Sequence, residues 1–134
     1  NNYELIREFL TPTEIVVEEL GLNRSKIILE PLEQGLLTNK YKKDSVFPTS
    51  DMRSAFSRDR IKTRIEKRNQ FNFLLNNERE INQVALSYVL NRNEISTTIP
   101  GVNSVLQLES NIKSSEIKLS LDEFHKIENI QKMW

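Results

Sequence analysis

Two segments of the sequence carry residues that could hold an anionic ligand. The first contains Gly35, where the missing side chain would let the backbone approach a ligand closely and aim its N–H groups at anionic oxygens. Lys40 follows in the same segment and could place a positive charge on a phosphate. Local chemistry alone favours a plainer interpretation, a connection between a strand and a helix with a solvated lysine.

The second segment begins near Gly101. Asn103 or Ser104 can cap a short helix whose N-terminus offers unpaired N–H groups and a partial positive charge. Gln107 and Asn111 are one helical turn apart and therefore share a helix face. An ordinary capped helix with two polar surface residues explains the same pattern, and without further information it is the first choice.

Each segment directly follows a short apolar run that is typical of a buried strand. Residues 26–29 precede Pro31, and residues 95–99 precede Pro100 and Gly101. Strands that alternate with helices predict a parallel α/β sheet with its functional residues at the strand carboxyl ends. Two short strands alone would leave both sheet edges bare, so the pattern indicates a slice of a larger fold.

The helices that position these strands are indicated by caps and apolar spacing. A first helix is expected over residues 11–20, with Thr11 as N-cap, Glu14 completing a capping box and Gly21 ending it. Residues 32–57 are expected to form a long functional or mobile loop. Further helices are predicted over residues 58–76, from residue 81, through residues 107–112, and after Ser120, where Leu121, Phe124, Ile127 and Ile130 should face inward.

The composition narrows the class of protein. The chain has 134 residues, 37% of them hydrophobic and 28% charged, which fits one globular domain. Lys plus Arg equals Asp plus Glu at 19 each, so no net field attracts nucleic acid, and a basic run at residues 58–68 is expected to be a solvated face. With no Cys and one His, a metal cluster is not expected. We expect a cytoplasmic protein that does not enter membranes.

Three motifs together resemble the aldo-keto reductase family. Residues 30–41, Glu-Pro-Leu-Glu-Gln-Gly-Leu-Leu-Thr-Asn-Lys-Tyr, are similar to the family's loop after the seventh barrel strand. Residues 99–112 resemble the segment after the eighth strand, and residues 81–90 resemble the helix between them. Any one motif alone is a weak signal, whereas three in the right order and at the right separations are specific. The resemblance covers nearly the whole chain.

The resemblance implies the C-terminal portion of a (β/α)8 TIM barrel, a fold that usually needs about 250 residues. Residues 1–134 would be the cofactor-binding part of that domain and would supply about two of its strands. The family's catalytic Asp, Tyr, Lys and His would lie in the N-terminal portion, outside this chain. No catalytic residue is therefore assigned here, and whether the chain acts as an enzyme is left open.

The resemblance also implies a nicotinamide cofactor, NADP or NAD, gripped by this part of an oxidoreductase that reduces aldehydes or ketones to alcohols. No Arg or Lys occupies positions 102–106, where family members that prefer a 2′-phosphate often have one, so the choice of cofactor stays open. Arg53, in the long loop, is expected either to touch the ligand or to lie on the surface. The residues expected to contact the cofactor are Leu29, Pro31, Leu32, Gln34, Gly35, Leu36, Lys40, Gly101, Val102, Asn103, Gln107 and Asn111.

Three positions depart from the family pattern. Leu29 stands where many members have an aromatic ring stacked on the nicotinamide, Glu30 replaces a common Ser, and Ser110 replaces the usual adenine-contacting Glu. Two alternatives to an enzyme portion also stay open. The chain could be a catalytically inactive remnant that acts as an interaction or regulatory module, or a helical interaction domain whose motif matches are accidental. The expected partners are the cofactor, a small carbonyl substrate in the complete enzyme, and either another copy of the chain or a complementing N-terminal part.

Overall fold

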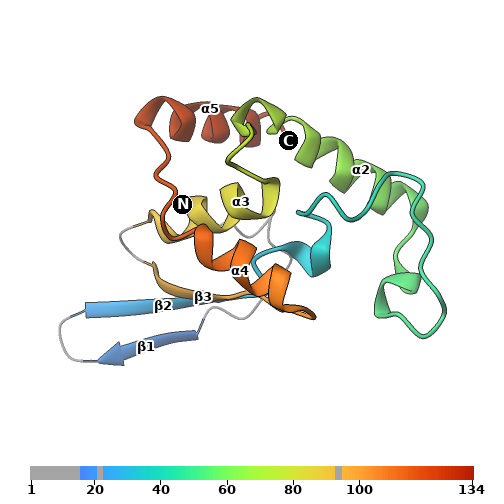
Figure 1. The fold of residues 1–134 in the computed structure, drawn as a ribbon, viewed down its shortest axis with the longest axis horizontal. Coiled ribbons are helices and arrows are strands. Elements are labelled where there is room, and N and C mark those ends of the chain that lie inside the picture. Colours follow the sequence, from blue (N-terminus) through green and yellow to red (C-terminus); the bar gives the residue numbers. More distant parts are fainter. Residues whose placement is uncertain (1–15, 21–22, 93–94) are drawn as a thin grey trace.

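The computed structural model describes residues 16–20, 23–92 and 95–134. A three-stranded sheet in the order β1-β2-β3 lies on one side, and helices are stacked over it, with α3 between the sheet and α5 (Figure 1). The α/β class expected from the alternation of elements is confirmed. The strands are β1 (Val16–Leu20), β2 (Asn23–Leu29) and β3 (Ile95–Ile99), and the helices are α2 (Arg58–Asn69), α3 (Ile81–Leu90), α4 (Val105–Lys113) and α5 (Leu121–Gln131).

The two predicted strands are neighbours and run parallel. Ile28 is paired with Thr98 and Leu29 with Ile99, and the Thr98 hydroxyl donates to the Ile28 carbonyl over 3.1 Å. Parallel strands end at the same edge of a sheet, so the segments that follow Leu29 and Ile99 start side by side.

The prediction of a helix over residues 11–20 is wrong for residues 16–20, the part that the structure describes. Val16–Leu20 forms β1, which pairs antiparallel with β2, Val16 opposite Ile27 and Leu20 opposite Asn23. Two adjacent β-branched residues, Val16 and Val17, suit a strand, and the pairing satisfies backbone groups of β2 that would otherwise form a bare edge. Thr11, Glu14 and Gly21, on which the helix prediction rested, lie outside the described residues.

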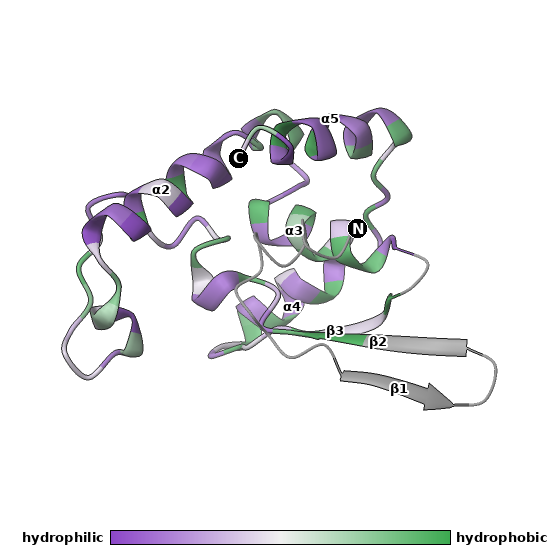
Figure 2. Ribbon diagram, turned by 180° about the vertical axis from the view of Figure 1, so that it is seen from behind, coloured by the Kyte–Doolittle hydropathy of each residue, from purple (hydrophilic) through white to green (hydrophobic). Residues whose placement is uncertain are grey.

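The core is organised around α3. Ile81, Val84, Tyr88 and Val89 are buried with the predicted spacing, and they pack with residues of both parallel strands and of α5. By contrast with α3, helix α2 consists mostly of hydrophilic residues (Figure 2).

The remaining helices follow their predicted caps, with two differences. Ser104 and Ser120 accept hydrogen bonds from the backbone N–H groups of Gln107 and Glu123 at the starts of α4 and α5. The helix expected to reach residue 76 ends at Asn69 and gives way to the 3₁₀ turn Asn72–Leu74. The prediction that Leu121 faces inward is wrong, because this first residue of α5 is 78% exposed. No helix within the described ranges is both long and apolar enough to cross a membrane.

Candidate functional site

A groove opens where β2 and β3 end. One wall is the loop after β2, and the other combines the segment after β3 with the start of α3. Its volume of about 1020 Å³ is at the upper end of the range for small-molecule sites, which leaves room for an elongated ligand. The lining residues are Glu30, Leu32, Gln34, Gly35, Thr38, Asn39, Lys40, Tyr41, Asp51, Met52 and Arg53 on the first wall, and Glu80, Asn82, Gly101, Val102, Asn103, Leu106, Gln107, Ser110 and Asn111 on the second.

Most of the residues expected to contact a ligand line this groove. Gly35 and Gly101 both line this groove, as one ligand that contacts both loops requires. Three of the expected residues lie outside the lining. Pro31 and Leu36 are almost completely buried, Leu36 against α2, and Leu29 is half-buried at the end of β2.

The first wall turns sharply through a run of left-handed backbone conformations. Glu33, Gln34 and Gly35 have φ angles of 46°, 53° and 89°. A Cβ atom on Gly35 would lie 3.0 Å from the Tyr41 ring, so this position needs glycine for both conformation and space. The Gly35 N–H donates to the Leu32 carbonyl over 2.9 Å. The N–H of Gly35 itself is therefore used inside the turn, and the expectation that backbone N–H groups of this loop face an anion stays a prediction.

Arg53 holds the turn from the other side of the long loop. Its guanidinium donates to the Gln34 carbonyl over 2.8 Å and forms a two-pronged ion pair with Asp51, with contacts of 2.9 and 2.6 Å. It also stacks 4.5 Å from the centre of the Tyr41 ring. The hydrogen bonds that Arg53 donates to Asp51 lower the pKa of this carboxyl to about 2. Sequence reasoning missed Asp51 and Tyr41, although the short Asp-x-Arg spacing was a signal for the ion pair.

Arg68 fixes the same loop from α2. Its Nη1 donates to the carbonyls of Leu36, Thr38 and Tyr41, so one side chain ties together the backbone on both sides of Lys40. Arg68 is only 7% exposed, and burial lowers the pKa of its guanidinium. The basic run of α2 was expected to be a solvated face. That expectation is wrong for Arg68, because this side chain is buried and donates hydrogen bonds to the loop carbonyls.

The second wall is a polar network that joins α3 to α4. The Asn82 amide donates to the Ser110 hydroxyl over 3.0 Å and to the Asn111 side-chain carbonyl over 3.3 Å. The Ser110 hydroxyl donates to Glu80 Oε2 over 3.2 Å. Gln107 accepts from the Asn103 N–H over 2.8 Å. Both predicted residues of α4, Gln107 and Asn111, therefore reach the groove with part of their hydrogen-bonding capacity already used.

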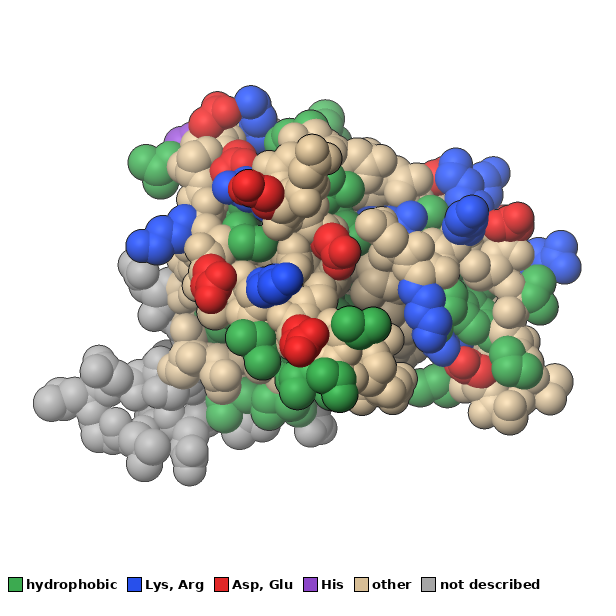
Figure 3. All heavy atoms as spheres, in the orientation of Figure 1, with side chains coloured by type: hydrophobic (Ala, Val, Ile, Leu, Met, Phe, Trp, Pro, Cys, Tyr) green, Lys and Arg blue, Asp and Glu red, His purple; other side chains and the backbone are tan. Residues whose placement is uncertain are grey.

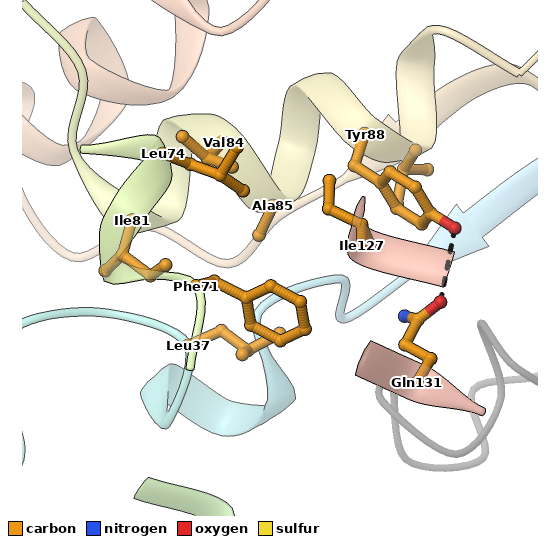
Figure 4. Close-up of a pocket in the computed structure, with 10 residues that line it drawn as sticks. Leu37, Phe71, Leu74, Ile81, Val84, Ala85, Tyr88, Ile127 and Gln131 are labelled. Atoms are coloured by element: carbon orange, nitrogen blue, oxygen red, sulfur yellow. Dashed lines mark hydrogen bonds between the residues drawn. The ribbon is translucent and has the colours of Figure 1, made fainter. Parts of the chain in front are cut away.

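A second, apolar cavity lies between α3 and α5 (Figure 4). Its polar groups are the Tyr88 hydroxyl and the Gln131 amide, which bond to each other over 3.3 Å. At about 40 Å³ it is a small gap in the core and is far too small for a dinucleotide. The described residues also contain no cluster of three or more side chains that could ligate a metal ion.

Two comparisons with known proteins bear on the family of this chain. A sequence model of the Aldo/keto reductase family matches residues 18–132. Over 51 residues the chain is 41% identical to an uncharacterized oxidoreductase of Schizosaccharomyces pombe, and that alignment covers 38% of this chain and 17% of the yeast protein. The matched part of the chain thus spans less than a fifth of the length of this curated relative. Because the family match extends over most of its residues, the chain belongs to the aldo/keto reductase family.

Proposed function

We propose that this chain is the cofactor-binding C-terminal portion of a (β/α)8-barrel oxidoreductase, and that the whole protein reduces aldehydes or ketones with NADP or NAD. The observation that carries the proposal is the single groove that joins the loops after two adjacent parallel strands. Ligands of α/β proteins bind at such carboxyl ends. A cytoplasmic location is part of the same proposal.

The residues of this chain would bind and orient the cofactor, whose nicotinamide supplies the hydride. Lys40 is an exposed cation on the groove wall, with its Nζ 5.3 Å from the centre of the Tyr41 ring. We assign it to the pyrophosphate. Arg53 and Arg68 would set the loop around it, and Gly101, Asn103, Gln107 and Asn111 would surround the adenosine end.

Binding of NADH to the 134-residue chain tests the proposal directly. We expect Lys40→Ala to weaken binding about tenfold, because it removes a charge-assisted contact to phosphate. Lys42→Ala is the matched control, since Lys42 is an exposed lysine of the same loop that does not line the groove. The proposal fails if neither NADH nor NADPH binds the chain, alone or supplemented with an N-terminal barrel portion, or if both variants behave alike.

One observation favours a second candidate, an interaction module. Val105, Leu108 and Ile112 form an apolar stripe on α4 and are 70%, 46% and 58% exposed. In Figure 3 apolar side chains gather over α4. In the barrel proposal this stripe packs against the missing N-terminal portion, whereas in an inactive remnant it would bind another copy or a partner.

A further inference from the structure

We infer that the groove discriminates against a 2′-phosphate and favours NAD(H) over NADP(H). The inference rests on the proposed function and specifies the form of the cofactor. It follows from the distribution of charge between the two walls of the groove, because the two cofactors differ only by a phosphate on the adenosine ribose.

The wall assigned to the adenosine end is neutral except for one carboxylate. Among the described residues of this wall, Asn82, Val102, Asn103, Gln107 and Ser110 are uncharged, and Glu80 is the charged side chain. A ribose 2′-phosphate is usually held by an arginine or lysine, whereas an unmodified 2′-hydroxyl donates to a carboxylate. The lining therefore matches the hydroxyl.

Glu80 is held in place at the groove. Its Oε2 accepts the Ser110 hydroxyl over 3.2 Å, and its backbone N–H donates to Gln83 Oε1 over 2.9 Å at the start of α3. The network through Ser110 connects it to Asn82 and Asn111, which also line the groove. A phosphate carries about two negative charges and would be repelled by this carboxylate.

The nearby cations are engaged elsewhere. Arg79 precedes Glu80 in the chain, but its guanidinium pairs with Glu123 of α5 over 2.8 Å. Arg53 lies on the opposite wall and is paired with Asp51 over 2.6 Å. Of the described residues that line the groove, only Lys40 is a cation outside any ion pair, and the pyrophosphate common to both cofactors would use it.

The test compares adenosine 5′-monophosphate with adenosine 2′,5′-bisphosphate, which differ only by the 2′-phosphate and do not need the nicotinamide half of the site. Calorimetric titration into the 134-residue chain should show binding of the monophosphate at least about tenfold tighter, a difference that shrinks in high salt. If the bisphosphate binds equally well or tighter, the inference is overturned while the groove remains a nucleotide site. If neither nucleotide binds the chain, alone or supplemented with an N-terminal barrel portion, the proposed function itself fails.

Two variants and one control assign the effect to this wall. Glu80→Gln should reduce the difference in affinity between the two nucleotides severalfold. Val102→Arg, at an exposed position that lines the groove, should raise affinity for the bisphosphate about tenfold, because it adds a charged partner for the phosphate. Glu66→Gln removes a carboxylate of α2 that pairs with Lys43 and does not line the groove, and it should leave the ratio of the two affinities unchanged. If the ratio of the two nucleotide affinities is unchanged in both groove variants, the inference is contradicted. Val102→Arg keeps the test valid if Glu80→Gln does not fold.

Discussion

Leu29 and Ile99 are opposite each other in the parallel pairing of β2 and β3. The two loops that follow them therefore leave one sheet edge at adjacent points, and this brings Gly35 and Gly101 to the same groove. A dinucleotide bound in an extended form must contact both loops at once. The pairing of these two strand ends is thus the physical condition for the proposed cofactor site.

Gly35→Ala should weaken both the fold of the loop and nucleotide binding. The φ of 89° disfavours any side chain, and the added methyl group would lie 3.0 Å from the Tyr41 ring. We expect a loss of about 1–2 kcal/mol in the free energy of unfolding, measured in urea, together with weaker binding of NADH.

Gly101→Ala is the matched control for stability. A Cβ atom at this position would have no heavy atom within 4 Å apart from its chain neighbours. The free energy of unfolding should therefore change by less than about 0.5 kcal/mol. Equal losses in the two variants would contradict the role given to the left-handed turn.

Local patterns predicted the elements that carry the groove. The apolar runs that end at Leu29 and Ile99, the caps Ser104 and Ser120, and the apolar spacing of α3 all depend on residues close in sequence. Such short-range signals survive in the fold because caps and amphipathic spacing stabilise a helix wherever it packs.

Features set by a pairing partner or by distant parts of the chain could not be predicted. Val16–Leu20 became a strand because β2 offered an edge to pair with, which outweighed the helix signals before it in the sequence. Arg68 reaches carbonyls about 30 positions earlier in the chain, and no spacing rule connects a helix arginine with a loop so far away. Long-range contacts of this kind decide the shape of the first wall of the groove.

Arg68→Ala should destabilise the loop that carries Lys40. The substitution leaves the buried carbonyl of Leu36 and the partly buried carbonyls of Thr38 and Tyr41 without this donor, so we expect a loss of about 2–3 kcal/mol in the free energy of unfolding. Amide hydrogen exchange of the loop should become faster and nucleotide binding weaker.

Arg68→Lys should rescue little of this loss, because an ammonium on a flexible stem does not reproduce the fixed arrangement of guanidinium donors. Lys62→Ala, at an exposed position of the same helix, serves as the control and should stay within about 0.5 kcal/mol of the wild type. If the loop exchanges no faster in Arg68→Ala than in Lys62→Ala, the positioning role is disproved.

The apolar stripe on α4 should make the isolated chain associate. A double variant in which both Leu108 and Ile112 are replaced by Gln loses two apolar side chains that are 46% and 58% exposed. Light scattering should then report a lower mean mass at high protein concentration. Leu121→Gln, on α5 and 78% exposed, is a control that lies outside the stripe. A wild-type chain that stays monomeric at every concentration would contradict this prediction.

Glu33 should make the protein less stable as the pH rises. The side chain is buried with its Oε1 3.2 Å from Arg64 Nε, and burial outweighs the attraction of Arg64 and raises the pKa of this carboxyl from 4.5 to about 7. The folded state therefore binds a proton more tightly than the unfolded state. Its stabilisation is fully present below pH 4.5 and is lost as the pH rises through 7, by at most about 3 kcal/mol.

Urea unfolding at pH 5 and pH 8 measures this difference. Glu33→Gln should abolish most of the decline, because the amide does not ionise, whereas Glu66→Gln should keep it, because Glu66 is exposed and its pKa is lowered by Lys43. Asp51 does not interfere. Its lowered pKa of about 2 stabilises the fold above its ordinary pKa of 3.8, and that contribution is lost only at more acidic pH. A decline of equal size in Glu33→Gln would show that another group titrates between pH 5 and 8, and that Glu33 is already ionised in the folded protein at the lower pH.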